Sequence, residues 1–397
     1  MVKRVIIFGS TGSIGNNTIE VINNLPDYKV VALAAYSNHK LLLEQAISLR
    51  PKAVAIFNDK YYIYLKRSLS RTKIFCGEDG LLEMVKQTDA EIFFAAFASA
   101  IGIKAVIEAI KKRMRICLAT KEILVSFGEI IMDLIRKYKS ELIPVDSEHS
   151  AIYQCLEGRR IEDVETIILT ASGGPFLNKP IKNVTKSDVL NHPVWSMGKK
   201  ITVDSATMMN KGLEVIEAYH LFGLPPEKIK VLIHPEAICH SLVQFVDGSL
   251  LAQLSVPDMR LPIQYALTAP RRTVSLVKKL NLSRIKKLNF QKPNYRKFPG
   301  LKLAYEALRI GKSMPAVLNG ANDEAVRQFL ADSIKFTDII KIIKKSMAAH
   351  NPYQGNIEDY LSAEKWAREY VRGLCQKECG VSRNLDGKKG LKSKEAL

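Results

Sequence analysis

Carboxylate side chains occur in two short strings whose composition suits a divalent-cation site. Asp146-Ser147-Glu148 follows the apolar run 141–145, and Glu214 ends the polar string 204–214. Because residues two apart on an extended chain point the same way, Asp146 and Glu148 could converge at the carboxyl edge of a sheet. Hard oxygen ligands favour Mg²⁺ or Mn²⁺ over zinc. An isolated D-x-E pair is more often a helix cap, so a metal site here depends on a third carboxylate.

The string 204–214 supplies that carboxylate beside groups that suit a phosphate. On a helix, Asn210 and Lys211 lie four and three residues before Glu214, so the three side chains share one face. Together with the upstream hydroxyl of Ser205 they form a plausible site for a metal and a phosphate. The competing interpretation is a polar helix face with an ordinary Lys–Glu pair.

Two further polar segments could contact a substrate. Ser172-Gly173-Gly174 ends an apolar run and offers backbone N–H groups and a hydroxyl to an anion, although it could equally be a simple turn. The segment 191–198 reads as a loop and contains His192 and Trp195. Such a loop can close over substrate as a lid, or Trp195 can instead anchor the loop to the core.

A glycine turn near the amino terminus indicates dinucleotide binding. Gly9, Gly12 and Gly15 lie between a short apolar run and a helical stretch, spaced G-x-x-G-x-x-G rather than the commoner G-x-G-x-x-G. Glycines there allow a tight turn and let backbone N–H groups approach a pyrophosphate. The segment 36–40 after the next strand has no acid, which favours the 2′-phosphate of NADPH over NAD. It could also be a plain helix start capped by Ser37 or Asn38.

The order of the strands and helices that must position these residues indicates an α/β protein of several domains. Short apolar runs alternate with amphipathic stretches up to about residue 150, which is typical of a doubly wound parallel sheet. An α+β segment follows, then a Pro-, Lys- and Arg-rich connection, a helical segment and a Lys- and Gly-rich tail. The expected strands are 4–8, 29–34, 53–57, 91–95, 115–119, 141–145, 166–170, 231–233, 241–246 and 249–255. The expected helices are 14–23, 40–49, 206–222, 301–308, 325–330 and 363–374.

The formal charge of +19 over 397 residues is compatible with anionic small molecules or with nucleic acid. We find no recognition helix, RNP, KH or zinc-finger pattern, so we expect no nucleic-acid partner. No apolar run is long enough to cross a bilayer, and the run 5–8 is too short for a secretory signal. We therefore expect a cytoplasmic protein with no membrane partner. Another Rossmann reductase, such as a semialdehyde or homoserine dehydrogenase, is a rival interpretation that needs no trio of carboxylates.

The chain resembles the 1-deoxy-D-xylulose-5-phosphate reductoisomerase family over about residues 3 to 374. The strings that carry the resemblance are Gly9–Gly15, Pro144–Ala151, Ala171–Gly174, His192–Gly198, Val203–Glu214 and Pro257–Arg260. The resemblance implies a Rossmann-like amino-terminal domain, an α+β catalytic domain and a carboxyl-terminal helical bundle, assembled as a homodimer. The implied parts are an NADPH domain at 1–147, a catalytic domain at 148–268 with a flap at about 189–199, a linker at 269–298, a helical domain at 299–375 and a disordered tail at 376–397.

The family's activity is an NADPH- and metal-dependent isomerisation and reduction of 1-deoxy-D-xylulose 5-phosphate to 2-C-methyl-D-erythritol 4-phosphate, in isoprenoid precursor biosynthesis by the non-mevalonate pathway. The resemblance implies one Mg²⁺ or Mn²⁺ held by Asp146, Glu148 and Glu214. The implied catalytic residues are Lys121, Glu148, His192 and Glu214. The implied substrate contacts are these four with Ser147, Ser172, Ser205, Asn210 and Lys211. The implied NADPH contacts are Thr11, Gly12, Ser13, Ile14, Ser37, Asn38, Thr120, Glu122 and Gly198, although the family usually has Asn where this chain has Thr120.

Overall fold

The computed structural model describes residues 2–97, 100–182, 184–191 and 198–387. The chain divides into two compact units. The first comprises Met1–Leu124, Gly128–Ser172 and Glu217–Lys292, and the second comprises Val125–Phe127, Gly173–Ile216 and Pro293–Leu397. Among the described residues, we find no helix that is both long and apolar enough for a membrane span.

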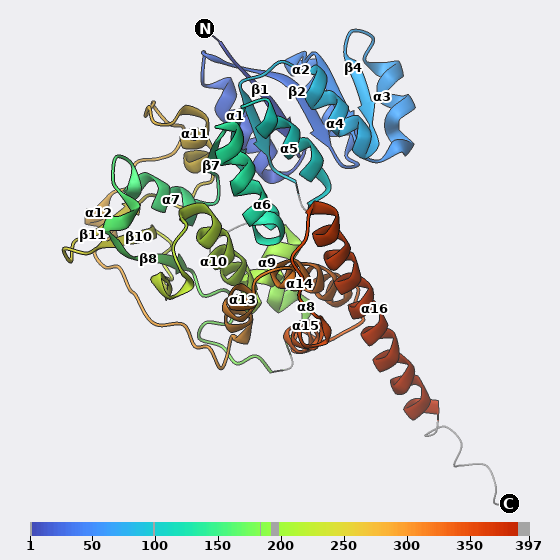
Figure 1. Ribbon diagram of the computed structural model, residues 1–397, viewed down its shortest axis with the longest axis vertical. Helices are drawn as coiled ribbons and strands as arrows, with labels where there is room; N and C mark the ends of the chain where they lie inside the picture. The colour runs from blue at the N-terminus through green and yellow to red at the C-terminus, as the bar shows by residue number, and fades with distance from the viewer. Residues whose placement is uncertain (1, 98–99, 183, 192–197, 388–397) are drawn as a thin grey trace, which may run out of the picture. The chain divides into compact units, whose positions relative to one another are not determined.

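A parallel seven-stranded sheet forms the centre of the first unit (Figure 1). Its strands are β1 (Lys3–Phe8), β2 (Tyr28–Ala35), β3 (Ala53–Ile56), β4 (Lys73–Cys76), β5 (Ile92–Ala95), β6 (Arg115–Leu118) and β7 (Glu141–Pro144). They lie in the order β4-β3-β2-β1-β5-β6-β7, which reverses direction after β1 as in a doubly wound dinucleotide fold. Six of these strands confirm the sequence prediction. The seventh, β4, was not predicted, because its only apolar positions are Ile74, Phe75 and Cys76.

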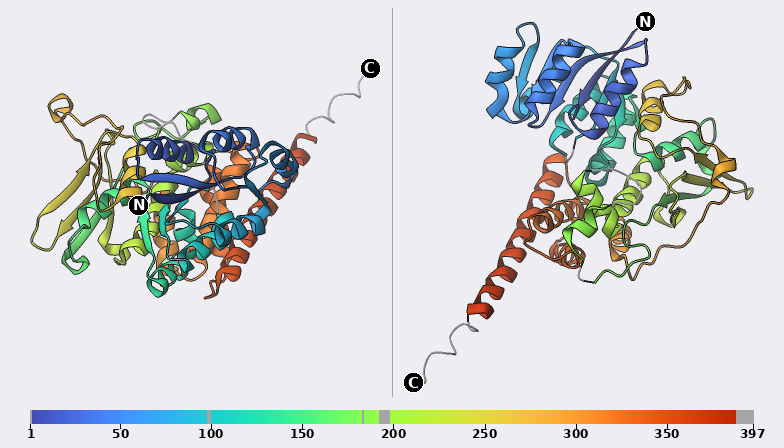
Figure 2. Two further views of the ribbon diagram at one scale, coloured as in Figure 1. Left: turned by 90° about the horizontal axis from the view of Figure 1, so that it is seen from above. Right: turned by 180° about the vertical axis from the view of Figure 1, so that it is seen from behind.

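Helices cover both faces of this sheet, and the left view of Figure 2 shows them as layers on either side of the blue strands. They are α1 (Ser13–Asn23), α2 (His39–Leu49), α3 (Tyr62–Ser68), α4 (Gly77–Gln87), α5 (Ile103–Lys111) and α6 (Glu122–Tyr138), with short 3₁₀ turns η1 (Asp59–Tyr61) and η2 (Ala100–Gly102). In such a sheet, each helix joins two parallel strands by a right-handed crossover. Because the strand order runs in opposite directions on the two sides of β1, the helices of the two halves of the sheet lie on opposite faces. Because all seven strands are parallel, their carboxyl ends lie at one edge of the sheet, where ligands of such sheets bind.

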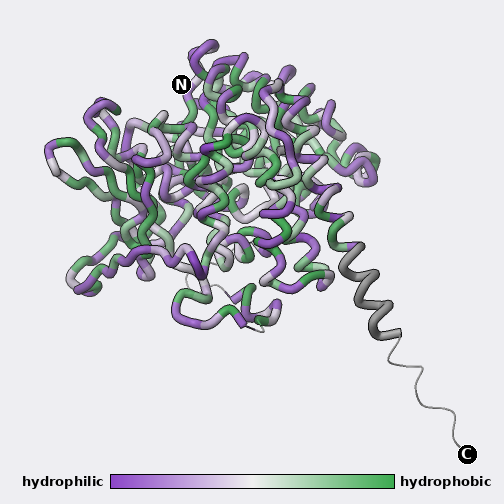
Figure 3. The backbone as a smooth tube through the Cα atoms, turned by 60° about the horizontal axis from the view of Figure 1, so that its bottom comes forward, coloured by the Kyte–Doolittle hydropathy of each residue, from purple (hydrophilic) through white to green (hydrophobic). Residues whose placement is uncertain are grey.

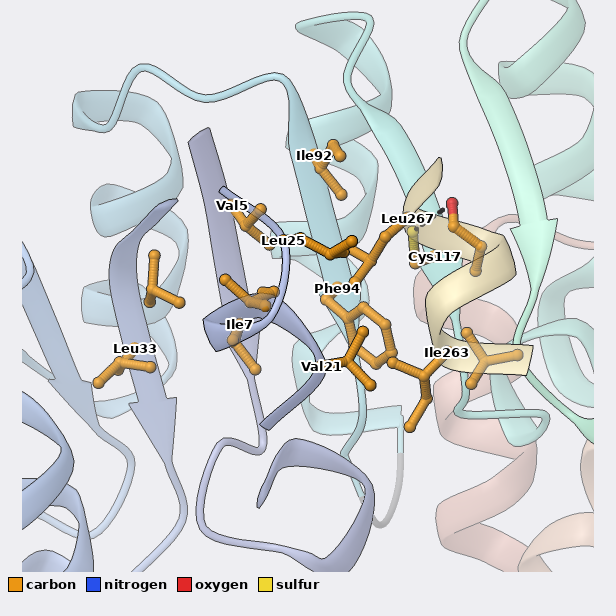
Figure 4. Close-up of a cluster of buried hydrophobic side chains, with 14 of the residues drawn as sticks. Val5, Ile7, Val21, Leu25, Leu33, Ile92, Phe94, Cys117, Ile263 and Leu267 are labelled. Atoms are coloured by element: carbon orange, nitrogen blue, oxygen red, sulfur yellow. Dashed lines mark hydrogen bonds between the residues drawn. The ribbon is translucent and has the colours of Figure 1, made fainter. Parts of the chain in front are cut away.

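The core between β1, α1 and a later helix, α11 (Arg260–Thr268), is made of fully buried aliphatic and aromatic side chains (Figure 4). Two polar contacts fix the end of α11 to the sheet. Tyr28 donates a hydrogen bond of 3.1 Å to the carbonyl oxygen of Leu267, and Arg115 donates to the same carbonyl at 2.9 Å. A segment more than a hundred residues further along the chain thus completes the core of the dinucleotide fold.

The string Pro257–Arg260 attaches α11 to α1. The Arg260 guanidinium donates to both carboxylate oxygens of Asp258, and its Nη1 lies 2.7 Å from Oε1 of Glu20 on α1. The hydrogen bonds from Arg260 lower the pKa of the Asp258 carboxyl, since they favour its ionised form. This motif therefore has a structural part in the first unit.

A second sheet of four strands belongs to the same unit. Its strands are β8 (Val164–Ala171), β9 (Ile229–Ile233), β10 (Cys239–Phe245) and β11 (Leu250–Leu254), in the order β11-β10-β8-β9. The helix α7 (Ser147–Leu156) packs against β10 and β11, and the 3₁₀ turns η3 (Ile161–Asp163) and η4 (Pro226–Lys228) precede β8 and β9. All four strands confirm the predicted runs.

The predicted linker 269–298 is partly ordered against this sheet. It contains the one-turn helix α12 (Leu282–Ile285), and Gln291 forms an antiparallel bridge with Ile233 at the end of β9. The buried ring of His234 strengthens this attachment. Its Nδ1 lies 2.8 Å from the carbonyl oxygen of Asn289, while its Nε2 accepts the backbone N–H groups of residues 238 and 239. Because Nε2 accepts, the proton of the neutral ring must be on Nδ1.

The second unit is helical. Its helices are α8 (Lys186–Leu190), α9 (Lys199–Thr207), α13 (Pro299–Ile310), α14 (Met314–Leu330), α15 (Asp338–Ala349) and α16 (Ile357–Gly387), together with the first part of α10 (Met209–Phe222). The helix α16 runs beyond residue 376, where the sequence predicts that order ends, and residues 388–397 lie outside the described range. Hydrophobic segments, green in Figure 3, alternate with hydrophilic segments, purple, along the described chain.

The continuous helix predicted over 206–222 is wrong at one position. Met208 adopts a left-handed conformation with φ of 58°, which ends α9 and lets α10 begin at Met209. The sequence gives no warning, since methionine is a good helix former. The hydroxyl of Thr207 accepts the Met209 N–H at 3.2 Å and so stabilises the break.

We predict that His220 makes the protein sensitive to mild acid. Its ring, in α10, is packed so close to Gly128 that a Cβ there would lie 2.2 Å from a ring carbon. Burial lowers the pKa of His220 to about 4, because the charged ring would lose its hydration. Its contribution to stability is therefore complete above the unfolded-state pKa near 6.5 and declines as the pH falls toward 4.

The measurement is the free energy of unfolding by denaturant at pH 7 and pH 5. The wild type should lose about 2 kcal/mol more than His220→Gln over this interval, from ~1.4 kcal/mol per pH unit. An equal pH dependence in the two proteins would contradict the assignment.

Candidate active site

The glycine turn between β1 and α1 has two kinds of glycine. Gly9 has a φ of +79°, and a Cβ on it would lie 2.0 Å from the carbonyl oxygen of Ala96. A Cβ on Gly15 would lie 2.2 Å from the carbonyl oxygen of Gly9. Gly12, the N-cap of α1, meets only that carbonyl oxygen, at 3.4 Å. The fold therefore requires Gly9 and Gly15, whereas the absence of a side chain at Gly12 leaves space for a ligand.

The electrostatics of this turn suit an anion. The first turn of α1, which starts with Ser13 and Ile14, carries no acidic residue, so the partial positive charge of the helix start is not neutralised. Gln45 of α2 braces the turn by donating to the carbonyl oxygen of Ser10 and to the amide oxygen of Asn16, both at 2.9 Å. The predicted contacts Thr11, Gly12, Ser13 and Ile14 thus all lie on one helix start.

The predicted ribose-side contacts lie just beyond β2. Ser37 and Asn38 are exposed, and the Asn38 side chain caps α2 by accepting the Leu41 N–H at 3.3 Å. The capping role considered from the sequence is therefore real. The cap does not exclude a role for Asn38 in cofactor binding. The segment 36–40 contains no acidic residue.

Thr120, Lys121 and Glu122 connect β6 to α6. The hydroxyl of Thr120 is buried and donates to the carbonyl oxygen of Phe97 at 2.9 Å. This bond directs the hydroxyl toward the protein backbone. The buried ammonium of Lys121 forms an ion pair with Asp146.

Asp146 and Glu148 stand at the start of α7. Asp146 is the N-cap, and Glu148 lies in the first helical turn, where the hydroxyl of Ser147 donates to it. The expectation that both carboxylates project from an extended strand is wrong, because the helix begins immediately at Ser147. Their position is nevertheless favourable for negative charge, since a helix amino terminus stabilises anions.

Two residues with no role assigned from the sequence adjoin Asp146. Nδ1 of the fully buried His149 lies 3.3 Å from Oε2 of the buried Glu217 and 4.0 Å from Oδ2 of Asp146. Ligand atoms of these three residues all lie within 4.8 Å of one another. The spacing of Asp146 and His149, one turn apart on a helix, could have suggested their contact. Glu217 comes from a distant part of the chain and gave no such signal.

In the second unit, residues that are predicted to bind phosphate and metal lie near the start of α10. The buried carboxylate of Glu214 accepts a hydrogen bond of 2.6 Å from Asn210 and pairs with the buried ammonium of Lys211. This confirms that the three side chains share a face. Gly174 packs against α9, since a Cβ on it would lie 2.8 Å from the carbonyl oxygen of Ser205.

A buried carboxylate beside Ser205 was also missed from the sequence. Asp204 accepts hydrogen bonds of 2.9 Å from Lys200 and from Asn322 of α14. These contacts hold the last turn of α9, which carries Ser205.

The structure thus brings the predicted residues together in two groups. Lys121, Asp146, Ser147 and Glu148 lie together in the first unit. Asn210, Lys211 and Glu214 lie together in the second unit, which also contains Ser205. Ser172 directly follows β8, and Gly198 caps α9. His192 and Trp195, with most of the predicted flap, lie outside the described residues. The convergence of Glu214 with Asp146 and Glu148 stays a prediction.

Comparison with known families gives three matches along the chain. Residues 5–128 match the family model described as 1-deoxy-D-xylulose 5-phosphate reductoisomerase. Residues 142–222 match the C-terminal domain model of the same enzyme, and residues 254–370 match a further model described as DXP reductoisomerase C-terminal domain. Together these models span nearly all of the parallel sheet, strand β8 of the second sheet and most of the helical unit.

Two relatives are similar along nearly their whole length. The 1-deoxy-D-xylulose 5-phosphate reductoisomerase of Geobacter metallireducens is 50% identical over 379 residues, which covers 94% of this chain and 99% of the relative. The enzyme of Chlorobaculum tepidum is 46% identical with the same coverage of both chains.

Two solved structures of reductoisomerases are also similar to this chain. The reductoisomerase of Zymomonas mobilis in complex with NADPH is 39% identical and superposes with a TM-score of 0.89, covering 94% of this chain and 99% of that one. A DOX-P reductoisomerase in complex with NADPH, fosmidomycin and magnesium is 37% identical with a TM-score of 0.90, covering 94% of this chain and 98% of that one. The chain belongs to the 1-deoxy-D-xylulose 5-phosphate reductoisomerase family.

Proposed function

We propose that this chain converts 1-deoxy-D-xylulose 5-phosphate to 2-C-methyl-D-erythritol 4-phosphate with NADPH and a divalent cation, in isoprenoid precursor biosynthesis. The observation that carries the proposal is the cluster of Asn210, Lys211 and Glu214 on α10. A buried carboxylate with an amine and an amide in one helical turn suits a metal and a phosphorylated substrate. An ordinary hydride-transfer enzyme of this fold does not need such a group.

The cofactor would bind along the carboxyl edge of the parallel sheet. We assign its contacts to Thr11, Gly12, Ser13, Ile14, Ser37, Asn38, Thr120, Glu122 and Gly198. The acid-free start of α1 supports binding of a pyrophosphate there, since its N–H groups are not neutralised by a side chain. The inward hydrogen bond of Thr120 supports a contact through its backbone rather than its hydroxyl.

One Mg²⁺ or Mn²⁺ would be held by Asp146, Glu148 and Glu214. All three ligands are carboxylates, the donor type that these hard cations prefer. Lys121 and Lys211 pair with Asp146 and Glu214 and so offset the negative charge that these acids place at the site. When bound, the cation polarises the substrate ketone and NADPH supplies the hydride.

The chain's own residues would hold and orient the sugar phosphate. Ser172, Ser205, Asn210 and Lys211 would bind its phosphate, with His192 contributing from the flap at about 189–199. Ser147, Lys121 and Glu148 would contact its hydroxyl groups. The Lys121 ammonium is held beside Asp146, so it can donate a proton or a hydrogen bond at a fixed place. We assign catalytic roles to Lys121, Glu148, His192 and Glu214.

The wider organisation is proposed on the same basis. We propose a homodimer in the cytoplasm, and the free thiols of the described cysteines 76, 117, 155, 239 and 375 support a reducing compartment. We propose neither nucleic acid nor a membrane as a partner. The proposed parts are a cofactor domain at 1–147, a catalytic domain at 148–268, a linker at 269–298, a helical domain at 299–375 and a tail at 376–397.

The two kinds of glycine in the amino-terminal turn predict two different mutant phenotypes. Gly12→Ala should keep its melting temperature within a few degrees while its NADPH Kd rises about 10-fold, because the new methyl group occupies the approach to the pyrophosphate. Gly15→Ala should instead lower the melting temperature sharply, because its Cβ collides with backbone. NADPH titration and thermal melting of both variants test this. Unchanged NADPH affinity in Gly12→Ala would contradict the cofactor assignment.

Glu214 provides the test of the metal and of the reaction. Oxidation of NADPH is followed optically with 1-deoxy-D-xylulose 5-phosphate, with and without Mg²⁺. Chelator should abolish turnover reversibly, and Glu214→Gln should lower kcat by more than the roughly 10–100-fold typical of losing an outer partner of a metal ligand. Its melting temperature should fall, because the buried Lys211 ammonium loses its charged partner, but the variant should still fold.

The matched control is Glu227→Gln, which removes an exposed carboxylate at η4 and should keep full activity. Turnover in excess chelator, or near-normal kcat in Glu214→Gln, would overturn the metal site and with it the proposed reaction.

A further inference from the structure

A break between two consecutive helices separates the proposed phosphate ligands of the second unit. The helices α9 and α10 meet at Met208, whose left-handed φ of 58° interrupts the helical backbone. Ser205 lies in the last turn of α9, whereas Asn210 and Lys211 lie in the first turn of α10. A left-handed conformation is unfavourable for methionine by itself. The separation of the ligands on the two helices therefore depends on the contacts that hold this break.

Asp204, the residue before Ser205, is buried and is held from a third helix. Its Oδ1 accepts a hydrogen bond of 2.9 Å from Nδ2 of Asn322 in α14, and its Oδ2 accepts one of the same length from Lys200 in α9. Because a carboxylate only accepts hydrogen bonds, the amide must present its NH₂ group to Asp204. Of these two bonds, the one from Asn322 joins the end of α9 to a different helix.

The backbone of Asp204 continues this connection to α10. Its carbonyl oxygen accepts a hydrogen bond of 3.1 Å from the hydroxyl of Thr207, and that hydroxyl accepts one of 3.2 Å from the N–H of Met209, the first residue of α10. A hydroxyl can donate one hydrogen bond while it accepts another, so the two bonds are compatible. A series of three hydrogen bonds thus runs from α14 through the end of α9 to the start of α10.

We propose that Asn322 is a positioning residue for the phosphate of the substrate, because it holds, through Asp204, the break that separates Ser205 from the ligands on α10. The inference rests on the proposed function, in which Ser205, Asn210 and Lys211 hold that phosphate. A hydrogen bond weakens steeply outside a narrow range of distance and angle. Donors on two helices therefore bind one anion well only while the helices keep a fixed geometry.

The charge of Asp204 does not depend on Asn322. The ammonium of Lys200 lies 2.9 Å from Oδ2 of Asp204, so the carboxylate keeps a positive partner when the amide is removed. Asn322→Ala should therefore fold with a lower melting temperature, since it loses one buried hydrogen bond and leaves a void. The variant keeps every phosphate ligand but loses the restraint on their separation, so its affinity for phosphate should fall.

The experiment measures the Kd of the full chain for inorganic phosphate by calorimetry, in the wild type and in Asn322→Ala. The Kd should rise about 10-fold in the variant, because the donors on the two helices are less well placed. The KM for 1-deoxy-D-xylulose 5-phosphate should rise by a similar factor. The kcat should change much less, because binding of the remote phosphate is weakened in the ground state and in the transition state alike.

Asn319→Ala is the matched control. Asn319 lies one turn earlier on α14 and is similarly buried, but its Nδ2 donates to Ser126 at 3.1 Å and to Glu364 at 2.8 Å, neither of which belongs to α9 or α10. This variant should also lower the melting temperature, yet its Kd for phosphate should equal that of the wild type. A rise of this Kd in both variants would indicate a general loosening of α14 and would overturn the proposal.

Thr207→Val tests the same series from its other end. Valine keeps nearly the same shape but removes the hydroxyl that joins Asp204 to Met209. It should also weaken phosphate binding, and the double variant with Asn322→Ala should be affected less than the two single effects combined, because both changes break one series.

Three results would overturn the proposal: no phosphate binding by the wild type, an unchanged Kd in Asn322→Ala, or fully additive effects of the two substitutions. A wild type that binds phosphate, with the expected response of the variants, but oxidises no NADPH with 1-deoxy-D-xylulose 5-phosphate would instead overturn the proposed function. The positioning of an anion by Asn322 would then still hold.

Discussion

A carboxylate removed from water must be matched by donors or by positive charge, because an uncompensated buried charge costs several kcal/mol. This constraint recurs throughout the molecule. Glu214 has Lys211 and Asn210, Asp204 has Lys200 and Asn322, and Glu364 of α16 accepts from Asn319 at 2.8 Å and from Arg368 at 2.9 Å. The packing of α9, α10, α14 and α16 depends on these pairs, since each joins a helix to another or fixes the helix end that carries a functional residue.

The same constraint is met by different partners at different acids. Around Glu364 the partners are an arginine and an amide within a helical bundle, where the arrangement needs no further ligand. Around Asp146 and Glu214 the partners are lysines, whose single flexible ammonium groups can be rearranged more easily than a guanidinium fork. A lysine can thus neutralise a carboxylate in the free protein and yield to a cation. The proposed chemistry relies on this property of the two amines.

The sequence predicted most of what depends on local pattern. Six strands of the parallel sheet and the shared face of Asn210, Lys211 and Glu214 follow from periods of two and of three to four residues. Part of what it missed depends on contacts between distant segments. The pairing of His149 with Glu217 and the bond from Asn322 to Asp204 are each determined by a partner far along the chain. The break at Met208 was missed because methionine favours a helix, although the hydroxyl of Thr207 stabilises the break locally. The start of α7 at Ser147 was misplaced because residues after a strand were taken to remain extended.

The bridge between Ile233 and Gln291 bears on self-association. Strand β9 is one edge of the four-stranded sheet, and an unpaired edge is a template on which identical chains can add without limit. The segment around Gln291 occupies that edge at Ile233, whereas in the described part of the chain no strand lies outside β11. The connecting segment therefore blocks this edge at Ile233 as a template for pairing with another chain.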